Sequence, residues 1–289
     1  MEFIKKIFSS ITATLKFFSE NFKGLLFVLI LVLIFAPDGE KELEKPNLQK
    51  IVLSGPIMDV SEVLNKLQKA KKDKNIKGVL FEVNSPGGAV APSIEISNAI
   101  KELKKQKPVI VYASGTIASG SYYASIWANQ IIANPGSMVG SIGVILEGAD
   151  VSGLMSKIGI KTQTIQAGKY KKVGTPDRAW KPYEIAELNK VIQDTYDMFC
   201  EDVAKARKLE LKKRDSWANA HIFTSRQAKK VKLIDEVATI SVAKKELEKL
   251  SGVKKPIWAK EDKFEKLLKK LTASASVVLY TYFPPITLK

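Results

Sequence analysis

Short apolar runs alternate with amphipathic segments along most of the chain after residue 47. The runs KIVLSGPI, KGVLFEV, KPVIVYAS and QIIANP have the composition of strands, and GVILEG and TQTIQAG are predicted to be two more. Between them, segments such as DVSEVLNKLQKAKKD and PSIEISNAIKELKKQ carry apolar residues at helical spacing. Alternating short strands and helices predict an α/β fold whose sheet is largely parallel.

A long helix is predicted from about Pro182 to Arg207, followed by short helices at TSRQAKKV and SVAKKELEKL. The buried face of the long helix is expected to consist of Ile185, Leu188, Ile192, Tyr196 and Phe199. The main folded domain is therefore placed at residues 48–250, and residues 251–289 are interpreted as a basic amphipathic and apolar tail.

The N-terminal region has the pattern of a membrane anchor. Residues 24–37 read GLLFVLILVLIFAP and carry no charge, although a span needs roughly 20 residues. A cleaved signal peptide is the alternative, but Ile34 and Pro37 do not suit a cleavage site after Ala36. We predict an uncleaved signal anchor over 22–37, a linker over 38–47, a cytoplasmic N-terminus and an extracytoplasmic domain, because lysines precede the apolar run and acids follow it.

The first 21 residues are predicted to be a cytoplasmic amphipathic segment. At helical spacing one face is apolar and Lys5, Lys6, Lys16 and Glu20 lie opposite it. This pattern is typical of a helix on the inner membrane surface, and a ragged flank of the anchor is the alternative. Counted over the first 23 residues, the apolar face consists of Phe3, Ile4, Ile7, Phe8, Ile11, Leu15, Phe18 and Phe22.

Composition adds to the predicted fold only an indication of which partners and cofactors the protein binds. The chain has 289 residues with 46 basic and 30 acidic, a net charge of +16, which favours an anionic neighbour such as lipid headgroups. Zinc-finger spacings and aromatic-studded basic strands are absent from the sequence, so nucleic acid is not expected. Neither clustered metal ligands nor a Walker-type phosphate loop is present, so we expect no cofactor. The single cysteine, Cys200, excludes an intrachain disulfide.

Two glycine-rich turns follow predicted strands, NSPGG at 84–88 and SGTIASG at 114–120. Ligands of parallel α/β sheets gather at the carboxyl ends of strands, where these turns lie. The backbone N–H groups of Gly87 and Gly88 can hold a developing oxyanion, and Ser119 is placed as a nucleophile at the start of a helix. The plainer alternatives are a Pro-Gly-Gly turn and a serine that caps a helix.

Neither of these turns contains a residue that could act as the general base for Ser119. His221, the only histidine, lies in NAHIFTS and has the surroundings of a structural residue. A neutral lysine can replace histidine. The ordinary lysine pKa is about 10.4, and burial lowers it by up to about 3–5 units. Composition cannot choose among so many lysines.

Five motifs in order, NSPGG, ASGSYYAS, GSIGVI, AGKYKKVGTPDR and SRQAKKVKLIDEV, give the chain a resemblance to a known family. Over roughly residues 48–250 it resembles the bacterial signal peptide peptidase SppA in its short, single-repeat form. The resemblance implies stacked ββα units like those of ClpP and the crotonases, and a Ser/Lys serine endopeptidase anchored in the inner membrane with a periplasmic catalytic domain. It also implies a homo-oligomeric ring whose active sites are shared between protomers, with remnant signal peptides as substrates.

Carried over by motif, the resemblance assigns Ser119 as nucleophile and Lys171 as general base. Ser141 matches a serine that hydrogen-bonds the lysine, and Gly88 and Gly120 match the oxyanion donors, with Gly87 as the alternate.

If TQTIQAG continued as a strand, Lys169 and Lys171 would point one way and Lys172 the other, so that only the resemblance separates Lys171 from Lys169. The family usually has glycine where this chain has Ser121, whose hydroxyl would narrow the site or act as a decoy nucleophile. A crotonase-like acyl-CoA enzyme and a non-catalytic membrane scaffold of the same fold are the alternative functions.

Overall fold

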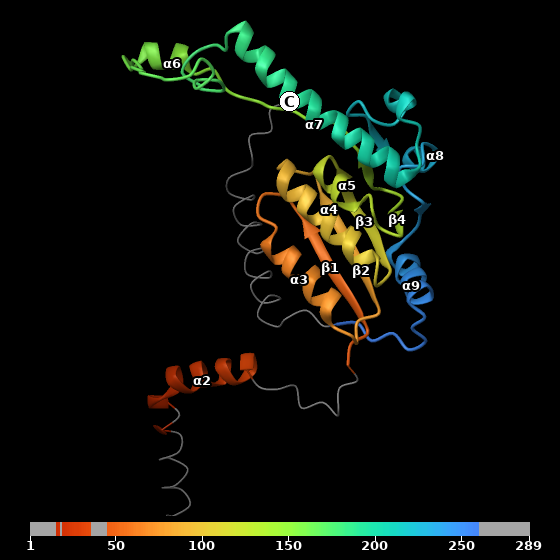
Figure 1. The fold of residues 1–289 in the computed structure, drawn as a ribbon. Helices are drawn as coiled ribbons and strands as arrows, with labels where there is room; N and C mark the ends of the chain where they lie inside the picture. The colour runs from red at the N-terminus through yellow and green to blue at the C-terminus, as the bar shows by residue number, and fades with distance from the viewer. Residues whose placement is uncertain (1–15, 18, 36–44, 260–289) are drawn as a thin grey trace, which may run out of the picture. The chain divides into compact units, whose positions relative to one another are not determined.

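The computed structural model describes residues 16–17, 19–35 and 45–259 (Figure 1). Residues 45–259 form one compact unit, and the helix α2 (Phe22–Phe35) belongs to another. In the described ranges, no helix combines the length and hydropathy that a membrane crossing requires. Most of the predicted surface segment, most of the linker and the tail beyond residue 259 lie outside the described residues, so those predictions stand as predictions.

A seven-stranded sheet organises the compact unit. Its main path is entirely parallel, in the order β1 (Leu48–Ser54), β2 (Gly78–Ser85), β3 (Val109–Ala118), β4 (Gln130–Ala133) and β7 (Glu236–Val237). The far end of β3 pairs with β5 (Met138–Gly140), which pairs antiparallel with β6 (Ile222–Thr224). The predicted α/β fold is therefore confirmed, with a mixed sheet that forks at the carboxyl end of β3.

Helices cover both faces of this sheet (Figure 1). One face carries α3 (Ser61–Lys72), α4 (Val90–Lys104) and α5 (Gly120–Ser125), and the other carries α9 (Ile240–Ser251). The predicted long helix is α7 (Pro182–Arg207), and the predicted short helices are α8 (Ser225–Lys230) and α9. The remaining helical elements are α6 (Ser152–Lys157) and the 3₁₀ helix η1 (Leu211–Ser216).

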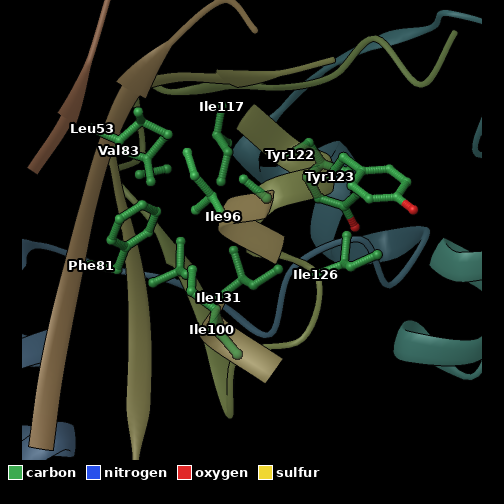
Figure 2. Packing of buried hydrophobic residues seen from close by; sticks show 14 of the residues in the cluster. Leu53, Phe81, Val83, Ile96, Ile100, Ile117, Tyr122, Tyr123, Ile126 and Ile131 are labelled. Carbon is green, nitrogen blue, oxygen red and sulfur yellow. The ribbon is translucent and has the colours of Figure 1, made fainter. Parts of the chain in front are cut away.

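The core lies mainly between the sheet and α4 (Figure 2). Phe81 and Val83 of β2 pack with Ile96 and Ile100 of α4, and all four are fully buried. Burying each such side chain contributes about 1.5–3 kcal/mol. On the opposite face a smaller cluster joins alternate strand residues to α9. A strand buried on both faces is typical of a parallel sheet, and it explains the continuous apolar run of β2.

The two predicted strands GVILEG and TQTIQAG are wrong. Residues 143–148 and 162–168 contain no strand, and Ile145 and Ile165 are 80% and 104% exposed. Their β-forming composition has no neighbouring strand to pair with among the described residues, and strand propensity depends on such a neighbour. We refer to residues 144–181 as the arm. The arm includes α6 and lies at the N-terminal end of α7 (Figure 1).

The predicted buried face of α7 is only half correct. Phe199 is buried against the core, whereas Ile185, near the arm, is 44% exposed, and Leu188, Ile192 and Tyr196 are partly buried. The helix therefore packs on the body at its C-terminal half and presents apolar side chains at its N-terminal half.

Candidate active site

Ser119 lies in a sharp turn between β3 and α5. Its backbone has φ 52° and ψ −126°, a conformation that residues other than glycine rarely adopt. The turn is held by a hydrogen bond from Ser119 N to Gly140 O (2.8 Å) and by one from Tyr123 N to Ser119 O (3.0 Å). Ser119 stands at the helix-capping position, but its side chain makes no capping hydrogen bond. Among the described residues the Ser119 hydroxyl has no hydrogen-bond partner, and a strained strand-to-helix turn that presents such a hydroxyl is the geometry of a nucleophile.

The glycine-rich loop after β2 packs directly against this turn. Ile57 N donates to Gly87 O and Ala89 N donates to Ile57 O, each at 2.8 Å. A β-carbon built on Gly87 would lie 2.7 Å from the Gly120 nitrogen and 2.8 Å from Ser119 Cβ. Glycine is required at position 87 because any side chain would displace the nucleophile turn.

Two backbone N–H groups are free at this contact. In the described part of the chain, neither Gly88 N nor Gly120 N donates a hydrogen bond. A β-carbon on Gly120 would lie 3.4 Å from Gly88 N, so the two amides belong to the same small region beside Ser119. Gly120 is buried, and buried donors normally have partners, whereas Gly88 is exposed at the cavity. Two unpaired amides beside a strained serine therefore form a site for an oxyanion, which would accept both hydrogen bonds.

An open cavity of about 650 Å³ begins at these residues. Ser119, Gly87, Gly88, Gly120 and Ser141 all line it. Its walls are mostly apolar and come from α4, α5, the arm and α7, through residues that include Val90, Ile94, Tyr123, Val144, Ile192 and Phe199. This volume is large enough for several side chains of an extended ligand.

Ser141 occupies a second constrained position at the rim. Its φ is 50°, and its N–H donates to His221 O at 2.7 Å. Asn219 and Ala220 line the cavity, whereas His221 is exposed and does not line it. His221 contributes only its backbone carbonyl, which accepts the hydrogen bond from Ser141, and this is the structural role that we expected for it.

Tyr123 joins the wall of the cavity to α7. Its ring packs edge-on against Phe199 with the centroids 4.8 Å apart, and its hydroxyl donates to Asp202. Burial, followed by the hydrogen bond to Asp202, raises the pKa of Tyr123, so its phenol stays protonated. Tyr123 therefore anchors the cavity wall and is unsuited to act as the base.

The three candidate lysines lie on the arm, in a run of turns that replaces the predicted strand. Lys172 pairs with Asp177 at 2.6 Å, and Lys169 lies over the ring of Tyr183 at 4.7 Å. Lys171 is exposed, and its side chain contacts no partner in the described residues. Period-two alternation does not apply to a turn, but the contacts distinguish the lysines, because the ammonium groups of Lys169 and Lys172 already lie against Tyr183 and Asp177.

The structure does not place Lys171 beside Ser119 of the same chain. The lysine turn packs against the start of α7, where Tyr170 and Tyr183 lie 5.6 Å apart, whereas α7 meets the serine helix at Phe199. Those two points on α7 are separated by about 24 Å at 1.5 Å per residue. A four-carbon lysine stem cannot span this distance. Of the predicted site residues, the chain therefore unites Ser119, Gly88, Gly120 and Ser141, but not Lys171.

A pair of ionic contacts fixes the turn that carries the lysines. Hydrogen bonds from Lys172 and Thr162 hold the pKa of Asp177 far below its ordinary value. Arg178 binds both carboxylate oxygens of Glu184 at 2.6 and 2.8 Å, and lowers the pKa of Glu184 to about 2. Sequence reasoning missed Asp177, Arg178 and Glu184, although charged pairs five and six residues apart in KVGTPDRAWKPYE (172–184) were the available signal.

A strained serine and two free amides at the head of an apolar cavity define a serine hydrolase class of site, suited to acyl transfer. Comparison with known families agrees with this class. Residues 101–254 match Peptidase family S49, and residues 46–131 match Clp protease. The chain belongs to Peptidase family S49, and its α/β fold is of the Clp protease kind.

Individual relatives support the same assignment. The chain is 43% identical over 198 residues to a candidate protease of Methanocaldococcus jannaschii, covering 68% of this chain and 64% of the relative. It is 35% identical to a candidate signal peptide peptidase SppA of Enterococcus faecium, covering 68% and 62%, and 32% identical to a candidate protease of Synechocystis, covering 72% and 76%. The chain thus spans less than two thirds of the first two relatives.

A solved structure of a ClpP1 mutant from Listeria monocytogenes has a TM-score of 0.48 and 16% identity, covering 67% of this chain and 93% of that one.

Proposed function

We propose that the protein is a membrane-anchored serine endopeptidase in which Ser119 of one subunit works with Lys171 of a neighbouring subunit. The observation that carries the proposal is the placement of Ser119, in a strained turn beside the unpaired amides of Gly88 and Gly120, at the head of the cavity. Membership of Peptidase family S49 supports peptide hydrolysis as the reaction.

A shared active site accounts for the position of the lysine. Lys171 is exposed on the arm, about 24 Å along α7 from its own serine helix. The arm also exposes large apolar side chains, which single subunits rarely do without a partner. They include Ile145, Leu154, Ile158, Ile160 and Ile165. If a neighbouring copy covered the arm, these residues would be buried, and Lys171 of the arm would reach the cavity of that neighbouring copy.

The proposed reaction has two steps. The neutral amine of Lys171 takes the proton of Ser119 Oγ, the oxygen attacks the peptide carbonyl, and Gly88 and Gly120 donate to the oxyanion. Lys171 then gives its proton to the leaving amine as the C–N bond breaks. In the second step water attacks the acyl-enzyme and Lys171 takes a proton of the water. Lys171 then gives this proton to Ser119 Oγ as the ester C–O bond breaks, so that the acid product leaves and both residues return to their starting states.

The substrates we propose are remnant signal peptides and other small peptides near the membrane. The apolar walls of the cavity favour small or apolar side chains beside the cleaved bond. The relative from Enterococcus faecium carries the name of a signal peptide peptidase. Residues 24–35 of α2 carry no charge and lysines precede them, which supports a signal anchor that leaves the catalytic domain outside the cytoplasm.

Fluorophosphonate labelling and peptide hydrolysis by the full chain in detergent test the proposal. We expect the probe to label Ser119, and Ser119→Ala and Lys171→Ala each to lose at least about 10³-fold in kcat. Lys161→Ala, which removes another exposed arm lysine, is the matched control and should keep wild-type activity. Absence of labelling, or full activity in Lys171→Ala, would contradict the proposed dyad.

Membrane placement needs a separate measurement. We expect the full chain to sediment with membranes after high-salt washing, and a chain lacking residues 1–37 to be released. Protease added outside the inner membrane should digest the catalytic domain of the full chain. Recovery of the full chain in the soluble fraction would contradict anchoring without affecting the test of the dyad.

A further inference from the structure

Ser121, which replaces the glycine usual in the resembling family, lies in the first turn of α5, two residues after Ser119. It is fully buried, and it does not line the cavity. Both expectations drawn for it from the sequence are therefore wrong: its hydroxyl neither narrows the site nor faces a substrate as a second nucleophile. The buried hydroxyl must act through the protein groups that it contacts.

Those groups belong to the two halves of the candidate active site. Ala118 N, immediately before the nucleophile, donates to Ser121 Oγ at 2.9 Å. Ser121 Oγ lies 2.7 Å from Ser85 O and 2.9 Å from Ala118 O, either of which can accept its one proton. Ser85 in turn accepts from Gly87 N through its own Oγ at 3.2 Å. One hydroxyl thus connects the residue before Ser119 with the residue from which the glycine loop starts.

We propose that Ser121 is a positioning residue that fixes the nucleophile turn against the glycine loop, so that the amides of Gly88 and Gly120 converge on one oxyanion. The inference rests on the proposed function, since it assigns Ser121 a role in that same reaction. A strained turn such as that of Ser119 persists only where its surroundings hold it. The Ser121 hydroxyl is one such constraint, and it is buried where water cannot substitute for it.

Loss of the Ser121 hydroxyl should affect the chemical step more than substrate binding. Ser121→Ala removes the side-chain acceptor of Ala118 N and the hydroxyl link to Ser85 O, but it touches no group that faces the substrate. Ground-state binding should change little, whereas the alignment of the oxyanion donors should loosen. Complete removal of one oxyanion donor costs about 10²–10³-fold in kcat, so misalignment should cost less, about 10- to 100-fold.

Ser125 provides a matched control in the same helix. It is also fully buried, and its Oγ donates to Ser121 O at 2.7 Å, one turn further along α5 and away from Ala118 and Ser85. Ser125→Ala deletes a buried hydroxyl of the same size without breaking the link between the two halves of the site. A merely structural role for Ser121 would make the two variants alike.

The test uses the full chain and three readouts: kcat and KM for a peptide, the rate of fluorophosphonate labelling at Ser119, and inhibition by a peptide aldehyde, whose adduct places an oxyanion in the site. For Ser121→Ala we expect kcat, labelling rate and aldehyde affinity each to fall about 10- to 100-fold, with KM within about twofold of wild type. Ser125→Ala should match wild type in all of these while its melting temperature falls by a similar amount.

Equal kcat and equal aldehyde affinity in Ser121→Ala and Ser125→Ala would overturn the inference, and so would a loss confined to KM. If Ser121→Ala does not fold, Ser121→Cys keeps the side-chain shape with a weaker donor and acceptor and should lose about three- to tenfold in kcat. Wild-type kcat in that variant would overturn the inference. Failure of wild-type Ser119 to label would refute the proposed function itself, an outcome distinct from equal labelling of the two variants.

Discussion

Gly87→Ala tests whether the close contact between the glycine loop and the nucleophile turn sets the activity. The new β-carbon would lie 2.7 Å from the Gly120 nitrogen and 2.8 Å from Ala118 O and Ser119 Cβ, where ordinary contacts begin at 3.4 Å. The turn must therefore shift by several tenths of an ångström. Positive φ at a non-glycine residue costs about 1–2 kcal/mol, and overpacking costs about 1–3 kcal/mol. These costs are tolerable against a typical stability of about 5–15 kcal/mol, so we expect the variant to fold.

The catalytic effect of Gly87→Ala should exceed its effect on stability. Displacing the Gly120 amide removes much of one oxyanion donor, so kcat should fall about 10²-fold while KM changes little. Gly252→Ala is the control, because Gly252 also has positive φ (68°) but nothing lies within 4 Å of its β-carbon position. It should lose about 1 kcal/mol of stability and no activity. Hydrolysis assays and thermal unfolding measure both quantities. A folded Gly87→Ala enzyme with kcat within about threefold of wild type would refute the reasoning.

Three further predictions follow from the described contacts. The pKa of Glu184 is lowered from 4.5 to about 2, so its contribution to stability is complete above pH 4.5 and is lost as the pH falls towards 2. Glu184→Gln should therefore melt below wild type at neutral pH, and the difference in melting temperature should shrink at about pH 3; a constant difference would contradict the ion pair as its cause. Tyr122→Phe removes the buried hydrogen bond to Leu233 O (2.7 Å) and should lower the free energy of unfolding, measured in urea, by about 1–3 kcal/mol. An unchanged free energy is expected only if a water molecule takes the place of the hydroxyl. Ile165→Asp should reduce the assembled mass measured by light scattering, whereas Val242→Asp on α9 should not. If the two variants have the same assembled mass, the arm is not part of the interface between subunits.

The sequence predicted those parts of the site that depend on strand order alone. Two glycine-rich turns after neighbouring parallel strands had to meet at one edge of the sheet, and Gly88, Gly120 and Ser119 do meet there. The strands predicted at 143–148 and 162–168 failed for the complementary reason. Their residues favour strands, but a strand forms only beside another, and Ile145 and Ile165 have no such neighbour among the described residues.

Side-chain roles could not be predicted from spacing. Ser121 stood out in the sequence only as a departure from a family pattern, and its role depends on Ser85, which is 36 residues away in the chain. The choice of Lys171 over its neighbours came from resemblance, and period-two alternation could not support it because the segment is a turn. The contacts of Lys169 and Lys172 give the physical distinction, since each of those side chains already has a partner.

The most direct test of the account is complementation between two inactive chains. Chains carrying Ser119→Ala and chains carrying Lys171→Ala are co-expressed in equal amounts with different affinity tags, and assemblies containing both are purified. If serine and lysine come from neighbouring subunits, about a quarter of the sites pair an intact Ser119 with an intact Lys171, and about a quarter of wild-type activity should return. Replacing the first chain by the double variant Ser119→Ala, Lys171→Ala should abolish this recovery. Mixed assemblies no more active than either parent would contradict the shared active site.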